Sequence, residues 1–156
     1  MASPPPPRPA PLPITKTCIF KKVNNVPIHV DLYSPTMPIE SGTDERAPIM
    51  LYIHGGGWMG SNRDDHSRPL FQHFLDLGFI IASMDYRLVP ESSIFQQFED
   101  VQDMEGWLKH ELPREIGEIR EEVQAEGVAE QQRKIIVAGA SAGAHLCLFI
   151  VSSIQN

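Results

Sequence analysis

The sequence predicts an α/β protein: an N-terminal antiparallel hairpin, then a mainly parallel sheet with flanking helices. Two observations carry this prediction. Short, continuously apolar runs, typical of strands buried on both faces, alternate along the chain with helical patterns. Ahead of them lies a segment that alternates apolar and polar residues, as a half-buried strand does. Strands that alternate with helices favour a parallel sheet with right-handed crossovers.

The N-terminal third predicts a tail, a hairpin and a loop. Residues 1–13 are rich in proline, and we expect a disordered tail outside the folded domain, which would span residues 14–156. Residues 14–23 can form a strand, and Asn24 and Asn25 can form a turn. Over residues 26–33, apolar residues recur at every second position. We therefore expect a hairpin with one face buried, followed by a loop over residues 34–47.

The rest of the chain predicts three buried strands and the helices between them. The strands are the apolar runs at residues 49–53, 79–84 and 135–138. The first two are separated by a helical pattern at residues 65–77, which ends at Gly78. Before the third strand, apolar residues at helical spacing from Phe98 to Leu112 predict an amphipathic helix. A Glu-rich surface helix is expected after Pro113.

Composition favours a soluble globular domain, since 42% of the residues are hydrophobic and 21% are charged. A net charge of −7 argues against nucleic acid and anionic membranes as partners. Cys18 and Cys147 lie in apolar runs and are expected to be buried free thiols. No run reaches transmembrane length and no signal peptide is visible, so we expect a cytoplasmic protein.

A five-residue turn, Gly139-Ala140-Ser141-Ala142-Gly143, stands between the last apolar strand and an apolar helix. This is the layout of a nucleophile elbow, in which glycines permit close backbone approach and Ser141 is strained and exposed. The helix behind it would direct backbone N–H groups and a positive dipole end at whatever Ser141 attacks. Taken alone, the pattern also fits a tight turn with an unreactive serine.

A second glycine motif, His54-Gly55-Gly56-Gly57-Trp58, directly follows the strand at residues 49–53. Three adjacent glycines cost conformational entropy, which indicates a loop whose N–H groups must approach something closely. A flexible glycine loop is the alternative. The run lacks the Lys-Ser/Thr of a phosphate loop and the spacing of a dinucleotide turn, and we expect neither a cofactor nor a metal.

Together with Asp85-Tyr86-Arg87-Leu88 and Pro90-Glu91, these two motifs resemble the α/β-hydrolase fold, and within it the hormone-sensitive-lipase-like esterases. The resemblance runs from about Ile14 to the C-terminus. It implies that Ser141 attacks an ester carbonyl to form an acyl-enzyme. The resemblance places the oxyanion on the backbone N–H groups of Gly56, Gly57 and Ala142. It also makes His54, Gly55 and Trp58 parts of the oxyanion loop, and Asp85, Tyr86 and Arg87 a structural signature of the scaffold.

The expected catalytic triad is incomplete. In this fold the acid and then the base follow the serine along the chain. Residues 142–156 contain no Asp or Glu, and their one histidine is His145, four residues beyond Ser141, where we expect it to face away from the reactive side or into the packing. No residue of this chain is therefore assigned as triad acid or base.

We accordingly expect the chain to be the N-terminal portion of a hydrolase. The strand at residues 135–138 would then be an open sheet edge, through which the chain could self-associate. Leu148, Phe149 and Val151 would be exposed on the last helix.

The predicted function is a serine carboxylic-ester hydrolase by family, acting on small acyl esters, with impaired or absent activity in this chain because the triad acid and base are missing. Two alternatives stay open: an amide-cleaving relative such as an arylformamidase, or a non-catalytic fragment that binds an acyl ligand or a partner.

Overall fold

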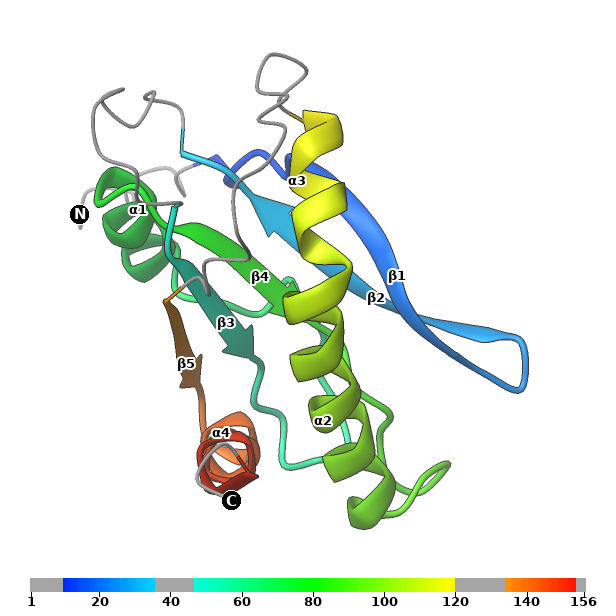
Figure 1. Cartoon of the computed structure of the whole chain (residues 1–156). Coiled ribbons are helices and arrows are strands. Elements are labelled where there is room, and N and C mark those ends of the chain that lie inside the picture. The colour runs from blue at the N-terminus through cyan, green and yellow to red at the C-terminus, as the bar shows by residue number, and fades with distance from the viewer. Residues whose placement is uncertain (1–9, 36–46, 120–133, 154–156) are drawn as a thin grey trace, which may run out of the picture.

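The computed structural model describes residues 10–35, 47–119 and 134–153, and within these ranges five strands form one mixed sheet (Figure 1). Its spatial order is β1-β2-β4-β3-β5. The pairs β1–β2 and β2–β4 are antiparallel, whereas β3 is parallel to both of its neighbours, β4 and β5. The predicted architecture is thereby confirmed. The strands are β1 Lys16–Val23, β2 Val26–Tyr33, β3 Ile49–Ile53, β4 Ile80–Met84 and β5 Ile135–Gly139.

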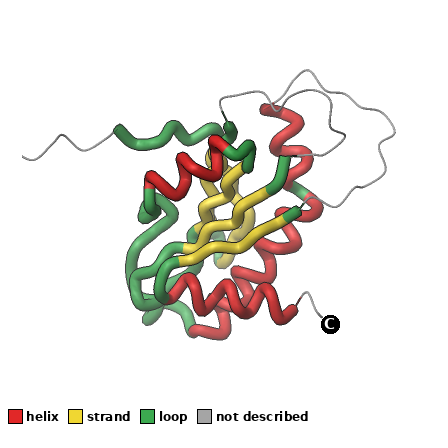
Figure 2. The backbone as a smooth tube through the Cα atoms, turned by 90° about the vertical axis from the view of Figure 1, so that its left-hand side faces the viewer, coloured by secondary structure: helices red, strands yellow, loops and turns green. Residues whose placement is uncertain are grey.

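Helices cover both faces of the sheet, as the edge-on view in Figure 2 shows. On one face, Phe71 of α1 packs into a cluster with Tyr33, Met50 and Ile81. On the other face, apolar side chains of α2, α3 and α4 pack over the central strands. The helices are α1 Arg68–Asp76, α2 Ile94–His110, α3 Leu112–Ile119 and α4 Ala142–Ser153. Within the described ranges, every helix is too short or too polar to cross a bilayer.

Capping residues explain where the helices begin. The predicted helix at residues 65–77 starts only at Arg68, because the Ser67 hydroxyl accepts a hydrogen bond from the Leu70 N–H. α2 starts four residues earlier than predicted, because Ser93 and Gln96 form a reciprocal capping box. α3 begins at Leu112 and includes Pro113, since a helix tolerates proline in its first turn.

The hairpin prediction is confirmed in pairing but wrong in burial. Asn24 and Asn25 both have positive φ, 49° and 65°, as a tight hairpin turn requires. The second strand, however, is not half-buried: Asp31 and Tyr33 are as inaccessible as Leu32. The reason is that β2 pairs with β4 as well as with β1, so its second half lies inside a sheet that is covered on both faces.

Burial differs from the prediction at Leu12 and at β5. Residues 1–9 of the predicted tail lie outside the described residues, but Leu12, which the sequence places in that tail, is buried in the cluster around Phe71. β5 is only half-buried, not fully buried as predicted, because within the described ranges it pairs with β3 alone and forms the sheet edge.

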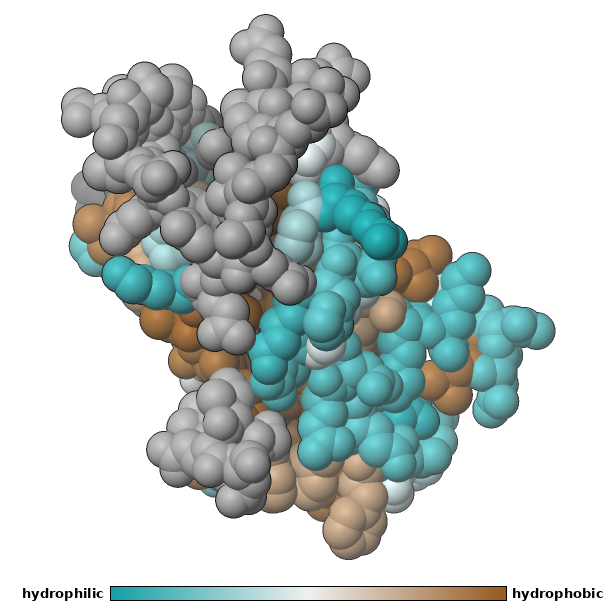
Figure 3. Space-filling view, viewed as in Figure 1, coloured by the Kyte–Doolittle hydropathy of each residue, from teal (hydrophilic) through white to brown (hydrophobic). Residues whose placement is uncertain are grey.

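Apolar side chains are exposed near this edge and on the helices beside it. Figure 3 shows hydrophobic surface over β5 and over the first turn of α2. The exposed fraction is 37% for Ile136 of β5, 67% for Leu148 and 43% for Phe149. The predicted exposure of the last two is confirmed, and the side chain of Val151 lies outside the description. Cys18 is a buried free thiol as expected, whereas the free thiol of Cys147 is half-buried.

Candidate active site

Ser141 stands at the turn between β5 and α4 in a strained conformation. It is exposed and has φ = 50°, in the left-handed region, which costs an L-residue roughly 1–2 kcal/mol. Its flanking glycines leave no room for a side chain. A Cβ at Gly143 would lie 2.1 Å from the Ile53 carbonyl oxygen, and one at Gly139 would lie 2.6 Å from the Gly143 carbonyl carbon. The close approach of α4 to β3 and β5 therefore imposes the conformation of Ser141.

The glycine loop lies against this turn, because β3 and β5 are parallel neighbours whose carboxyl ends meet at the same edge of the sheet. A Cβ at Gly55 would lie 2.9 Å from the Ala140 carbonyl oxygen and 3.5 Å from Ser141 Cβ. The next three residues all have positive φ: 95° at Gly56, 62° at Gly57 and 65° at Trp58. The fold thus brings the two glycine motifs into contact.

Backbone donors at this junction are unused. The N–H groups of Gly56, Gly57 and Ala142 donate no hydrogen bond to any residue in the described ranges. Ala142 is the first residue of α4, where helical N–H groups have no partner within the helix. Space is open beside Gly57, since a Cβ there would meet nothing within 4 Å. Such donors beside an exposed serine can stabilise negative charge on an oxygen.

The buried rings of His54 and Tyr86 anchor the start of the glycine loop. The His54 ring is buried and stacks on the Tyr86 ring at a centroid distance of 4.3 Å. The Tyr86 hydroxyl donates to the carbonyl oxygens of His54 (3.2 Å) and Gly55 (3.0 Å), and His54 Nδ1 lies 2.9 Å from the Gly55 oxygen. Burial lowers the pKa of His54 and raises that of Tyr86 to about 12, so both rings are neutral near pH 7.

Asp85 anchors a later part of the same loop, because it binds Arg63. It accepts from the Arg63 backbone N–H (2.8 Å) and from Nη1 of the guanidinium (2.6 Å). Arg63 Nε also lies 2.8 Å from Oδ2 of Asp31, which is fully buried. The sequence does not reveal the roles of Arg63 and Asp31. Asp31 falls on the polar side of the alternation over residues 26–33, which predicts an exposed side chain, and an arginine in a loop gives no pattern to detect.

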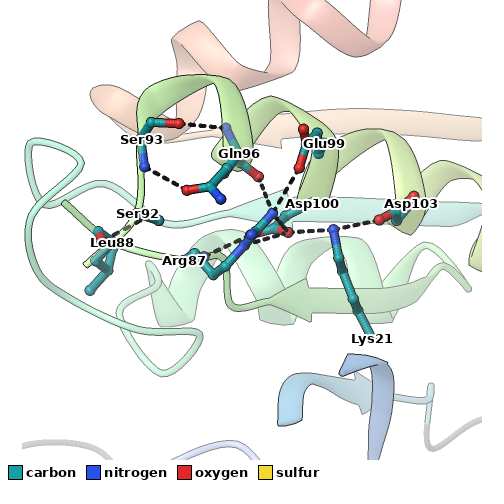
Figure 4. A network of polar contacts seen from close by, with 9 residues as sticks. All are labelled: Lys21, Arg87, Leu88, Ser92, Ser93, Gln96, Glu99, Asp100 and Asp103. Atoms are coloured by element: carbon teal, nitrogen blue, oxygen red, sulfur yellow. Dashed lines mark hydrogen bonds and ion pairs between the residues drawn. The ribbon is translucent and has the colours of Figure 1, made fainter. Parts of the chain in front are cut away.

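Arg87 joins the end of β4 to α2 through the fully buried Asp100 (Figure 4). Asp100 accepts from the Arg87 backbone N–H (2.9 Å) and from its Nε, and Lys21 Nζ lies 2.7 Å from the same carboxylate. Nη2 of Arg87 donates to the Gln96 carbonyl oxygen at 2.8 Å. The side chains of Asp85 and Tyr86 therefore bind the loop after β3, and that of Arg87 binds α2. None of their hydrogen bonds reaches Ser141.

No histidine ring in the described ranges forms a hydrogen bond with Ser141; His145 bonds to it only through its backbone N–H, which donates to the Ser141 carbonyl oxygen at 3.3 Å. The His145 ring is exposed and stacks on the Trp58 indole, with centroids 5.5 Å apart and planes 17° apart. It thus lies on the loop side of α4, not in the core. His66 stacks on Phe71, on the α1 side of the sheet. The remaining three are His29 in β2, His73 in α1 and His110 at the end of α2.

Comparison with known proteins places this arrangement in a family. The BD-FAE family model matches residues 30–156, which is most of the chain. Among curated proteins, the non-reducing polyketide synthase Preu6 of Preussia isomera is 32% identical over 142 residues. These residues are 90% of this chain and 6% of that protein. The non-reducing polyketide synthase ausA of Aspergillus calidoustus is 35% identical over 153 residues, 95% of this chain and 6% of that protein.

Solved structures of an esterase match this fold. The apo form of Thermogutta terrifontis esterase 2 superposes with a TM-score of 0.63 at 24% identity, covering 90% of this chain and 47% of that one. Its propionate-bound form gives a TM-score of 0.64 at 25% identity, covering 91% and 46%. The chain thus spans less than half of this esterase and 6% of each of these synthases. The resemblance to α/β-hydrolase esterases is confirmed: this chain belongs to the BD-FAE family, and it folds as an esterase-like α/β-hydrolase domain.

Proposed function

We propose that this domain is built for serine-dependent hydrolysis of small carboxylic esters, with Ser141 as nucleophile. One observation carries the proposal: a strained, exposed serine at φ = 50° lies against a glycine loop whose N–H groups are unused within the described residues. The turn holds the Ser141 side chain exposed, next to the loop where space is open beside Gly57, and an ester could bind there. The esterase with this fold has been solved bound to propionate and to butyrate, which supports small acyl groups as the substrate class.

The chemistry follows that of acyl transfer. Ser141 Oγ attacks the carbonyl carbon of the ester while its proton passes to a base, and the carbonyl electron pair moves onto oxygen. The N–H groups of Gly56, Gly57 and Ala142 hold this oxyanion; removing one such donor typically costs about 2.7–4 kcal/mol of transition-state stabilisation. Collapse of the intermediate expels the alcohol and leaves an acyl-serine, which water then hydrolyses.

We assign none of the described residues as the base for these steps. His54 is buried against Tyr86, and His145 lies on Trp58. We therefore propose that these 156 residues alone have low activity. Loss of a triad member leaves roughly 10³–10⁴-fold catalysis over water from the oxyanion hole and binding, and a supplied base should raise the reactivity of Ser141.

The proposal is tested by labelling the chain with a fluorophosphonate, with and without imidazole as an external base. We expect slow formation of one covalent adduct, detected by intact mass and mapped to Ser141, and faster formation with imidazole. The Ser141→Ala variant controls for other serines. The proposal fails if Ser141 stays unlabelled with imidazole present, or if the Ser141→Ala variant is labelled equally fast.

We further propose that the open edge at β5 mediates self-association. The edge strand presents apolar side chains such as Ile136, and Leu148 is exposed on the neighbouring helix α4. Unpaired strand edges with apolar side chains favour pairing with another chain. Sedimentation velocity should show concentration-dependent oligomers that are weakened by Ile136→Lys, whereas a monodisperse monomer at high concentration would contradict the proposal.

A further inference from the structure

We infer that Gln97 is a positioning residue for the oxyanion loop: its side-chain amide fixes the Trp58 carbonyl and with it the orientation of the Gly56 and Gly57 N–H groups. The catalytic consequence rests on the proposed function, whereas the anchoring itself does not. Gln97 is a polar residue of α2 that has no role in the acyl-transfer steps given above.

Gln97 is fully buried, and one of its amide atoms is satisfied by the loop. Nε2 donates to the Trp58 carbonyl oxygen at 3.0 Å. Oε1 is also buried and accepts no hydrogen bond within the described residues. The orientation of the amide is decided by the partner, because a carbonyl oxygen can only accept and the NH₂ group must face it.

An apolar residue would therefore serve the packing of α2 better. An unsatisfied buried acceptor costs about 1–3 kcal/mol, which a side chain of similar length without an amide would not incur. Val101 and Met104 on the same helix show that apolar side chains are well accommodated in this core. Among the residues that the structure describes, the hydrogen bond to Trp58 is the side-chain interaction that distinguishes Gln97 from such a residue.

The acceptor lies at a sensitive point of the loop. Trp58 follows Gly56 and Gly57, and its own φ of 65° is costly for a residue with a side chain, roughly 1–2 kcal/mol. Its carbonyl receives a second hydrogen bond from the Val89 N–H at 2.9 Å, and its indole stacks on His145 of α4. Trp58 is thus fastened from α2, from the segment after β4 and from the nucleophile helix.

The two ends of the glycine run are consequently clamped by different elements. Tyr86 holds the carbonyls of His54 and Gly55 at the upstream end, and Gln97 holds Trp58 at the downstream end. Between them, the Gly56 carbonyl accepts from the N–H groups of Met59 (3.2 Å) and Gly60 (3.1 Å), which closes the turn. Releasing the downstream clamp should loosen this turn and misdirect the Gly56 and Gly57 donors.

The first arm of the test measures the loop directly. In Gln97→Met, amide hydrogen exchange at Met59 and Gly60 should become about five- to tenfold faster than in the wild type, as expected for loss of one anchoring hydrogen bond. The urea midpoint should stay the same or rise, because the unsatisfied Oε1 is removed. A residue kept only for packing would show the reverse: unchanged loop exchange and lower stability.

Tyr52→Phe provides a matched control. Tyr52 is also buried, it packs in the cluster around Phe71, and its hydroxyl donates to the Asp65 carbonyl oxygen at 3.2 Å. This variant removes one hydrogen bond to a carbonyl outside the glycine run and its flanking turn. It should lower stability while leaving exchange at Met59 and Gly60 within twofold of wild type.

The second arm measures fluorophosphonate labelling of Ser141 in the presence of imidazole. Gln97→Met should lower the limiting labelling rate about tenfold with little change in the concentration for half-saturation, and Tyr52→Phe should leave both unchanged. Equal exchange at Met59 and Gly60 in wild type and Gln97→Met would overturn the inference, and so would altered exchange with an unaltered limiting rate. If the wild-type chain is not labelled, the proposed function fails and the exchange arm alone decides whether Gln97 anchors the loop.

Discussion

Replacement of Gly143 by alanine tests how closely the nucleophile helix approaches the sheet. The added methyl group would lie 2.1 Å from the Ile53 oxygen, 2.4 Å from the His54 oxygen and 2.7 Å from the Ile53 carbonyl carbon. Real Cβ atoms essentially never come within 3.0 Å of another heavy atom, so α4 and the end of β3 would have to separate by about 0.9 Å. All three atoms are backbone, so no side-chain rotation can relieve the overlap.

We expect Gly143→Ala to lower the free energy of unfolding by at least about 3 kcal/mol, the upper part of the range for overpacked sites. For a domain with a total stability of about 5–15 kcal/mol this is a large loss, and the variant is expected to express poorly. Gly106→Ala is the matched control, since a Cβ at Gly106 meets nothing within 4 Å and the residue lies inside α2. Alanine there should raise stability by up to about 1 kcal/mol.

Urea denaturation followed by circular dichroism measures both variants against the wild type. The reasoning predicts opposite signs for the same chemical change at the two glycines. An unfolding free energy of Gly143→Ala within about 1 kcal/mol of wild type would refute the close approach of α4 to β3, and with it the structural origin of the strain at Ser141.

Three further predictions concern the groups that hold the site. Asp100→Asn should lower the free energy of unfolding by about 3–5 kcal/mol, because it leaves Arg87 and Lys21 without their buried carboxylate; the exposed Asp103→Asn should cost at most about 1 kcal/mol in the same urea titration. Tyr86→Phe removes the hydroxyl that donates to two buried carbonyls and should cost about 1–3 kcal/mol, and an unchanged urea midpoint would contradict the clamp. Burial lowers the pKa of His54 below 6.5, so on acidification the unfolded chain binds a proton there before the folded chain does, and the free energy of unfolding should fall as the pH drops below about 6.5. His54→Gln should flatten this decline between pH 7 and pH 5. An identical pH slope in both proteins would count against the role of His54.

Local patterns in the sequence are sufficient to predict the strands and helices and to recognise the two glycine motifs. Continuous apolar runs marked β3 and β4 correctly because helices cover both faces of those strands. Alternation failed for β2 because burial of Asp31 depends on its partner strand: Arg63, which is far away in sequence, reaches its carboxylate. Pairing between distant segments leaves no periodicity to detect.

The candidate site divides in the same way. Ser141 and the glycines are recognisable because backbone geometry restricts the residue type at each position. Gln97 and Asp100 carry no such signature, since on the sequence they occupy ordinary positions in an amphipathic helix. Gln97 bonds to the Trp58 carbonyl and Asp100 to the Arg87 guanidinium, and only the fold brings these groups together.

A crystal structure of the fluorophosphonate adduct would show whether Ser141 and the N–H donors of Gly56, Gly57 and Ala142 act on one reacting centre. We expect phosphorus bonded to Ser141 Oγ, with its phosphoryl oxygen about 2.7–3.1 Å from the backbone nitrogens of Gly57 and Ala142. An adduct on another residue, or a phosphoryl oxygen that points away from both nitrogens, would contradict it.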